Sequence, residues 1–496
     1  MLINFFRRLF GRLPSAQPAR HTPTPAHIPA QPPSLPPVTA APTPPPQAAP
    51  PPNPTFETLN QQAPLKASLS QTPPPEPFSE EIGSAIICRE AVLNRQQKIA
   101  GYQFLLKDSA YANIRSRRRR ILQLYAEVLV DNLLRADIAT LLGPRLAFID
   151  IPDFFLDHPL MDELPVANTV IIVTPSDLPD APSVEKLRIQ ISALRARGYR
   201  IGIPNRESAP QFAPLLSGVD LVAVQAPQLT AEAGINLSRS ILSDAPNAAL
   251  LVRAVPGMED FHFCYQIGVG LFQGPFITSR EQWQAKNLGP NFARLTLLLS
   301  RLRQDAENRE IVALLKQDGA ITVRMLRYIN SAANGLPEHV SSLERALVLL
   351  GRKPLSRWLT IMLCSADRSQ ARSAAVLEAA LVRARTMELI AARRPTAERE
   401  AMFLTGLLSL IDVILQQPIA KALPSLAIGV DIEDAILNNK GPYAHGLMLV
   451  KACESADIDA IVFAATLCGV TPEEAANWHM EALAWTLALQ QEQEAA

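Results

Sequence analysis

Residues 170–203 read VIIVTPSDLPDAPSVEKLRIQISALRARGYRIGI, and this stretch decides the fold class. It begins with the run Val170-Ile-Ile-Val173 and ends with the run Tyr199-Arg-Ile-Gly-Ile203, and the segment between them is long enough for a helix. Short runs rich in β-branched residues are typical of buried strands. A strand, a helix and a second strand in this order predict one βα unit of a parallel sheet.

The same unit recurs along the chain. Further short apolar runs, separated by helix-length segments, stand at 85–87, 146–149, 221–224 and 250–252. Six such runs within about 200 residues predict an α/β barrel of the TIM type. After about residue 290 the strand pattern ends, and helical periodicity predicts an all-α carboxyl half whose first helices lie at 292–303, 307–315, 321–331 and 342–349.

The composition changes sharply near residue 80. Half of the 44 prolines lie between Pro14 and Pro77, and proline removes backbone donors and fixes φ, so a packed core cannot form there. We predict a disordered linker over residues 14–82. On a helix, residues 1–13 (MLINFFRRLFGRL) would gather large apolar side chains on one side, flanked by three arginines. This amphipathic segment fits an interfacial membrane anchor, a peptide that docks into a partner's groove, or a disordered end.

Charge and cysteine content exclude several protein classes. Lys and Arg number 47, as do Asp and Glu, so no net charge draws the chain to nucleic acid. The five cysteines are scattered without a CxxC pair, which argues against a disulfide framework or a zinc site and favours a reducing cytosol. No apolar run is long enough for a membrane span. We expect a cytoplasmic protein, and residues 1–13 leave open a peripheral contact with the inner face of the cell membrane.

Three motifs in the barrel half occur in an order that resembles the EAL domain, the fold that hydrolyses the bacterial messenger cyclic di-GMP. NRQQKIAGYQFLLK at 94–107 resembles the opening hairpin with its Glu-Ala-Leu signature. GYRIGI at 198–203 resembles the strand before an Asp-Asp pair, and VGLFQGPF at 269–276 resembles the closing Gln-Gly turn. We place this EAL-like domain at residues 83–285.

The helical half resembles the HDOD domain. The hallmark is carried by YINSAANGLP at 328–337, VSSL at 340–343 and ALVLLGR at 346–352, and KGPYAH at 440–445 and Trp485 resemble later helices of the family. We place this domain at residues 288–490. EAL-like and HDOD domains in this order form a bacterial signalling arrangement, so each resemblance supports the other.

The EAL resemblance implies a site in which carboxylates at the ends of barrel strands hold two divalent cations. The signature glutamate falls on Gln103, a metal-binding asparagine on Asp150 and a metal-binding glutamate on Arg253, while the closing glutamine is retained as Gln273. The other matching positions are Ile172, Pro204, Asn205, Ala223, Gln225 and Pro256. Because the windows 170–176, 200–206 and 221–226 contain no Asp or Glu, we predict a degenerate phosphodiesterase-like barrel without catalysis, metal or cofactor.

A barrel without catalysis could still bind the nucleotide. Lys107 stands where the family has an arginine that contacts a ligand phosphate, and a lysine keeps the charge without the bidentate fork. Lys107, Arg253 and Gln273 could hold a phosphate without metal, or they could be ordinary polar residues at a barrel mouth. The sequence favours the second interpretation.

The remaining polar motifs point to no chemistry. Related HD hydrolases bind metal through histidines and a His-Asp pair, whereas the matching helix here has Ser409-Leu410. We expect the dispersed His339, His445 and His479 at surface or cap positions. The run Arg115-Ser-Arg-Arg-Arg-Arg120 fits the solvated side of a helix or a contact with an acidic partner, and it lacks the aromatic residues of a nucleic-acid site.

Together these features predict a signal-transduction scaffold that acts through protein–protein interaction with signalling partners that the sequence does not name. The alternative is a receptor that binds cyclic di-GMP without cleaving it. An active phosphodiesterase would need metal ligands that the sequence lacks. A homodimer is left open because EAL barrels often dimerise, and no specific nucleic acid is expected.

Overall fold

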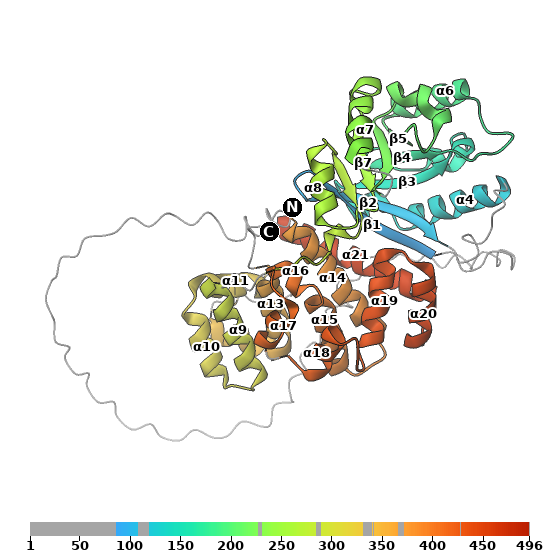
Figure 1. Cartoon of the computed structure of the whole chain (residues 1–496). Helices are drawn as coiled ribbons and strands as arrows, with labels where there is room; N and C mark the ends of the chain where they lie inside the picture. The colour runs from blue at the N-terminus through green and yellow to red at the C-terminus, as the bar shows by residue number, and fades with distance from the viewer. Residues whose placement is uncertain are drawn as a thin grey trace, which may run out of the picture.

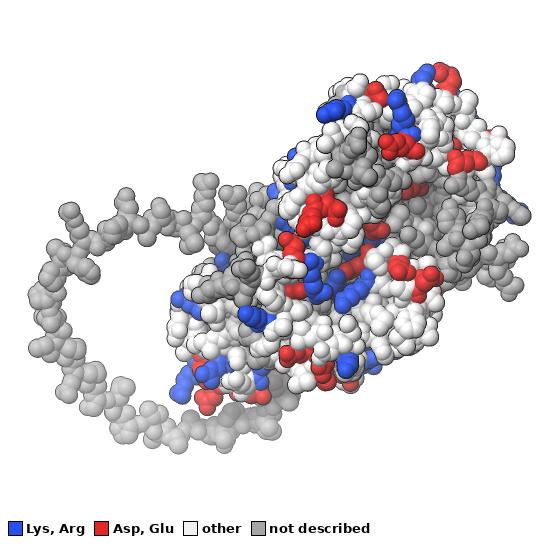
Figure 2. Space-filling view, viewed as in Figure 1, with Lys and Arg blue, Asp and Glu red and all other residues white. Residues whose placement is uncertain are grey.

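The computed structural model describes residues 86–107, 119–226, 231–283, 289–330, 340, 342–365, 372–426 and 428–495. They form a barrel with its surrounding helices, followed by a region built from helices alone (Figure 1). The predictions for residues 1–13 and 14–82, for His339 and for Arg115–Arg118 concern parts of the chain outside these ranges. On the face seen in Figure 2, acidic and basic side chains are interspersed, in keeping with the balanced formal charge.

Eight strands close into a barrel, which confirms the predicted α/β barrel. The strands β2 to β8 run parallel, whereas β1 runs antiparallel to both of its neighbours, β2 and β8. The run at 85–87 proves to be the start of a nine-residue strand. The strands are β1 (Ile86–Asn94), β2 (Ile99–Lys107), β3 (Leu146–Pro152), β4 (Thr169–Thr174), β5 (Arg200–Pro204), β6 (Leu221–Gln225), β7 (Ala249–Arg253) and β8 (Leu271–Gln273).

Alternate residues of the strands face the barrel interior, as the pleat requires. The interior is filled by an apolar cluster of Val92, Phe148, Val170, Ile172, Leu221, Ala223 and Leu251. Intervening residues such as Ile149 and Val222 belong to a larger cluster on the outer side of the strands. By the same alternation, Asp150 follows Phe148 and Arg253 follows Leu251 on the inward face, at the carboxyl ends of their strands.

Helices cover the outside of the barrel: α4 (Arg119–Arg135), α5 (Ile138–Leu142), α6 (Val184–Arg197), α7 (Ala231–Asp244) and α8 (Met258–Gln266). In α6 the Ser183 side chain accepts a hydrogen bond from the Lys186 amide at the start, and Gly198 ends the helix with φ +106°. The buried residues Leu187, Ile191 and Leu194 recur at helical spacing and turn one face toward the strands.

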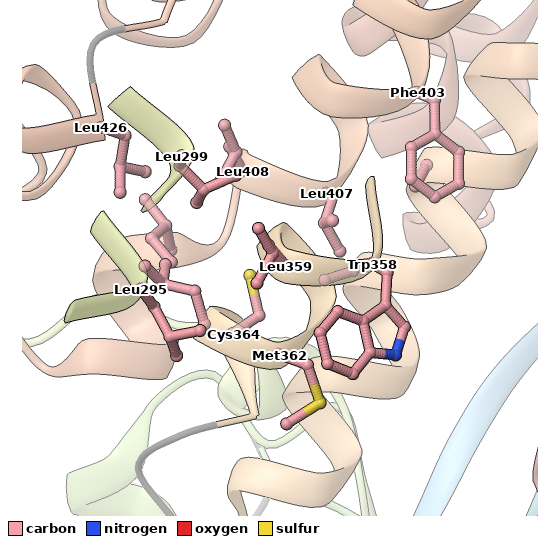
Figure 3. Packing of buried hydrophobic residues seen from close by; sticks show 14 of the residues in the cluster. Leu295, Leu299, Trp358, Leu359, Met362, Cys364, Phe403, Leu407, Leu408 and Leu426 are labelled. Carbon is pink, nitrogen blue, oxygen red and sulfur yellow. The ribbon is translucent and has the colours of Figure 1, made fainter. Parts of the chain in front are cut away.

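The carboxyl half is all-α, as predicted, and its first four helices begin and end within three residues of the predicted positions. Its helices are α9 (Gly289–Arg303), α10 (Asn308–Lys316), α11 (Gly319–Ile329), α12 (Leu343–Leu350), α13 (Arg352–Cys364), α14 (Ser373–Ile390), α15 (Thr396–Leu408), α16 (Ile411–Leu415), α17 (Ile419–Ala422), α18 (Val430–Leu437), α19 (Ala444–Ser455), α20 (Ile458–Cys468) and α21 (Pro472–Ala495). Their buried faces share one core, in which Leu359 and Met362 of α13 lie near Leu295 of α9 (Figure 3).

The two halves meet at what we call the junction, where α14 and α21 pack on the outer face of the barrel. The apolar residues Val382 and Leu483 belong to the same buried cluster as the barrel strands. Within the junction, Arg145 donates to both oxygens of Glu378 at 2.8 and 2.9 Å, and the Tyr102 hydroxyl also donates to Glu378. Burial and the negative charge of Glu378 raise the pKa of Tyr102 well above its usual value. The barrel and the helical half are therefore held together by packing and by a buried ion pair.

Within the described ranges, no helix combines the length and the apolar character needed to cross a bilayer. His445 is exposed, as expected. The surface position expected for His479 is wrong: the residue is buried in α21, and neither ring nitrogen has a hydrogen-bond partner in the described structure. Burial, with the charges of Arg89 and Arg383, lowers the pKa of His479 well below its usual value.

We expect His479 to make the fold less stable in acid. The unfolded chain takes up a proton near pH 6.5, whereas the folded state keeps the ring neutral, so the unfolded state binds more protons below that pH. The free energy of unfolding should then fall by up to about 1.4 kcal/mol per pH unit below about pH 6.5. In urea unfolding, His479→Leu should remove this slope and the exposed His445→Leu should keep it. Equal slopes in the two variants would show that the ring is protonated in the folded state.

Candidate functional site: the mouth of the barrel

The carboxyl ends of the parallel strands meet at one mouth of the barrel, where barrels of this type position their ligands. Three of the predicted residues come together there: Gln103 on β2, Asp150 on β3 and Arg253 at the end of β7. The Arg253 guanidinium donates to both Asp150 oxygens, at 2.8 Å to Oδ2 and 2.7 Å to Oδ1. It also donates to Gln103 Oε1 at 2.9 Å, and Gln103 Nε2 donates to Asp150 Oδ1 at 3.2 Å. The carboxylate is therefore held by a bidentate ion pair and an amide.

The turn after β7 packs closely on the turn after β8. The Val255 amide donates to the Gln273 carbonyl at 3.0 Å, and the Phe276 amide donates to the Val255 carbonyl at 3.1 Å. Between them, Gly274 has φ +142°, and a Cβ there would lie 2.4 Å from the Val255 nitrogen. Only glycine fits this close approach, which explains the Gln-Gly sequence and places Gln273 beside the strand that carries Arg253.

Gln273 has a partner that sequence reasoning missed. Its Nε2 donates to Glu90 Oε2 at 2.7 Å. Glu90 lies on β1 directly opposite Gln103 in the antiparallel ladder, and Val92 lies opposite Gln273 on the other side. The sequence signal for Glu90 was its spacing from Val92. Val92 lies in the barrel interior, and a residue two positions earlier on the same strand faces the same side. The mouth thus contains two carboxylates, and each accepts hydrogen bonds from a neighbouring side chain.

The other predicted positions are distributed as follows. Lys107 is the last residue of β2, and its side chain lies outside the described part of the chain. Ile172 and Ala223 belong to the apolar cluster of the interior. Asn205 is buried just after β5, where its Oδ1 accepts a hydrogen bond from the Ser208 amide at 3.3 Å. Of the arginine run, Arg119 begins α4 and pairs with Asp180.

These residues do not fit a pair of divalent cations. Such ions need several oxygen ligands, mostly carboxylates, and Asp150 already has both oxygens bound to a guanidinium. A cation placed beside Arg253 would meet a fixed positive charge at close range. Across the described ranges, no group of three or more His, Cys, Asp and Glu side chains is arranged to hold a metal ion.

The helical half also has an arginine beside the residue where its family resemblance suggests a metal site. Ser409, where the sequence resemblance places the His-Asp pair, is buried, and its hydroxyl accepts from Arg383 Nη1 at 3.0 Å. Arg383 also forms a bidentate pair with Glu454 at 2.8 and 2.7 Å. On the same helix as Glu454, burial and the charges of nearby arginines lower the pKa of Lys451 to about 8. Both places that the family resemblances suggest as metal sites therefore contain an arginine paired with a carboxylate.

Comparisons with known proteins identify the helical half. The family model of the HDOD domain matches residues 291–427. The uncharacterized protein YuxH of Bacillus subtilis (strain 168) is 22% identical over 409 residues, covering 80% of this chain and 97% of YuxH. The cyclic di-GMP phosphodiesterase CdgJ of Vibrio cholerae serotype O1 is 23% identical over 416 residues, covering 83% of this chain and 94% of CdgJ.

Among solved structures, the EAL enzyme Bd1971 in its cGMP-bound form is 13% identical, with a TM-score of 0.33. That alignment covers 38% of this chain and 60% of the enzyme. The similarity to CdgJ spans both halves of the chain, and the HDOD match lies within the helical half. An eight-stranded barrel followed by a helical region that contains the HDOD match is the order of domains that the sequence predicted.

Proposed function

We propose that this chain is a non-catalytic signal-transduction scaffold, acting through protein–protein contacts in a pathway related to cyclic di-GMP. One observation carries the proposal: the bidentate pair between Arg253 and Asp150 at the mouth of the barrel. Phosphodiester hydrolysis by two metals requires cations that activate water and stabilise the leaving oxygen. Here the strands that would supply their ligands offer Ile172, Pro204 and Ala223 instead.

Releasing Asp150 for a metal would be costly. The Arg253 side chain is 12% exposed, so breaking the pair would leave a mostly buried guanidinium without its carboxylate. Gln103 bonds to both members and holds the pair in one geometry. A fixed ion pair of this kind favours a structural role for the mouth over turnover. The name of the Vibrio cholerae relative supports the link to cyclic di-GMP, because that protein resembles this chain along most of its length.

One observation favours a second function, a receptor that binds cyclic di-GMP without cleaving it. Arg253 Nε and Gln273 Oε1 are buried at the mouth, and neither has a hydrogen-bond partner in the described structure. Unpaired polar atoms of this kind suit a polar ligand. A phosphate could accept from the Arg253 guanidinium without any metal.

Calorimetric titration of the full chain with cyclic di-GMP, with and without Mg²⁺, tests both functions. We expect intact nucleotide under either condition, as measured by chromatography afterwards, and no heat if the chain is a scaffold. Binding without cleavage would identify the receptor, and Arg253→Ala should then weaken it at least about tenfold, the loss expected for one charge-assisted hydrogen bond. Arg188→Ala, on the exposed side of α6, is the matched control. Mg²⁺-dependent cleavage that is lost in Asp150→Ala would overturn the proposal.

A further inference from the structure

Helix α20 has an unusual outward face. Its inward side packs through Ile461, Ala464 and Ala465, but its outward side is apolar as well. Phe463 is 61% exposed, and Val462 and Leu467 are also exposed. A helix at the surface of a soluble protein normally turns charged residues outward, and single exposed apolar residues are common. Three large ones on one face of an eleven-residue helix indicate a surface that binds something.

The stretch of chain that carries this face is acidic. The chain contains no Lys or Arg after Lys451, whereas it contains eight Asp and Glu residues in that span: Glu454, Asp457, Asp459, Glu473, Glu474, Glu481, Glu492 and Glu494. In Figure 2 the region where Figure 1 labels α20 is mostly white, with a few acidic side chains beside it. Glu454 and Glu481 pair with Arg383 and Arg385, so the acidic border of this face consists of Asp457 and Asp459 at the start of α20 and Glu473 and Glu474 at the start of α21. We call Val462, Phe463 and Leu467 with this acidic border the α20 surface.

The opposite end of the chain has the complementary composition. Residues 1–13 contain eight large apolar residues together with Arg7, Arg8 and Arg12, and the first acidic residue of the chain is Glu57. On a helix, six of these apolar residues would share one side, with the arginines beside them: Leu2, Phe5, Phe6, Leu9, Phe10 and Leu13. We propose that residues 1–13 dock on the α20 surface of the same chain, with the apolar side on Phe463 and the arginines toward the acidic border.

The point at which the chain enters the fold makes this docking geometrically feasible. Ile86 and Cys88, at the start of β1, belong to the same buried cluster as Ile461, Ala464 and Ala465 of α20. The proline-rich linker therefore joins the fold next to the helix that carries the surface. The linker spans residues 14–82 and would reach as far as about 200 Å if fully extended as polyproline II. A tethered segment of this kind is present at an effective concentration on the order of 1 mM.

Docking within the chain would give the protein two states. In one, residues 1–13 cover the α20 surface. In the other, both are exposed, and either could bind a partner or a membrane. An affinity of about 100 µM for the isolated segment would keep roughly nine-tenths of the molecules docked at that effective concentration. A competitor that binds either residues 1–13 or the α20 surface could therefore shift the equilibrium to the undocked state.

Limited trypsin digestion of the full chain measures the docked fraction directly. Trypsin cleaves after arginine, and Arg7, Arg8 and Arg12 lie in the docked segment, whereas Arg20 lies in the linker as an internal reference. We expect initial cleavage at Arg12 to be about tenfold slower than at Arg20 in the wild-type chain. The variant Phe463→Asp should make the two rates similar. Val430→Asp, which introduces the same charge at another exposed apolar residue, should leave the protection unchanged.

A second variant guards against an effect of Phe463→Asp on folding. Phe6→Ser alters only the segment, and it should also abolish protection at Arg12. Protection should not depend on protein concentration, because docking is intramolecular. Equal cleavage at Arg12 and Arg20 in the wild-type chain would overturn the proposal. So would protection that increases with protein concentration, which indicates a second copy, or protection that appears only with anionic vesicles, which indicates a membrane anchor.

Discussion

Replacing Glu378 by alanine should lower the free energy of unfolding by about 3–5 kcal/mol, the range for breaking a buried ion pair by removing one partner. Glu378 accepts hydrogen bonds from Arg145 and Tyr102, and all three side chains are buried at the junction. Without the carboxylate, the Arg145 guanidinium would remain in the interior without the negative charge of Glu378. Chemical denaturation followed by circular dichroism measures the loss, and a separate unfolding transition for the barrel would show that the junction couples the two halves.

Two further variants separate the ion pair from general damage. Glu185→Ala removes one partner of an exposed pair with Arg188 and should cost less than about 0.5 kcal/mol. The double variant Arg145→Met, Glu378→Leu replaces both charges by apolar groups and should recover most of the stability. A loss below about 1 kcal/mol in Glu378→Ala would mean that water reaches Arg145 and solvates it.

Gly406→Ala should destabilise the helical half by about 2–3 kcal/mol. Helix propensity alone predicts the opposite sign, a gain of about 1 kcal/mol. A Cβ at Gly406, however, would lie 2.7 Å from the backbone nitrogen and Cα of Ala384, where α15 crosses α14. Backbone atoms cannot move aside as a side chain can, so the two helices would have to separate, at the upper end of the cost of overpacking.

Gly319→Ala is the matched control for this variant. Gly319 also lies in a helix, α11, but a Cβ there would meet nothing within 4 Å. It should be neutral or stabilising in the same denaturation experiment. If Gly406→Ala were stabilising as well, α14 and α15 would have to be farther apart in solution than the structure places them.

The architecture could be predicted because its signals are local. β-branched runs such as Val170–Val173 mark strands wherever they pack, and the period of the apolar residues places α9 to α12 within a few residues. The strand β1 is different, since Arg89 and Glu90 divide it into two short apolar runs, 86–88 and 91–93. These two residues face a helix on one side and the barrel mouth on the other. A strand with polar residues on both faces at its centre shows neither one continuous apolar run nor a simple alternation.

The positions of the candidate site residues could be predicted from the sequence, but their hydrogen bonds and ion pair could not. Gln103, Asp150 and Arg253 follow from their places at the strand ends. Yet Asp150 and Arg253 are 103 residues apart, and nothing in the sequence shows that the arginine reaches the carboxylate. The junction was harder still, because Tyr102 and Glu378 are 276 residues apart and belong to different halves. His479 was misplaced for the same reason, since its burial depends on how α21 packs.

The place of β1 in the fold has a consequence for how the protein is made. Ile86 and Cys88 are covered by residues of α19, α20 and α21, which include Leu449, Ala465 and Ala476. At a synthesis rate of about 5–20 residues per second, the ribosome needs on the order of 10–40 s to proceed from β8 to this part of α21. During that interval a nascent barrel exposes an apolar strip on its first strand. That strip is where a chaperone would bind the growing chain, and where an incomplete translation product would aggregate.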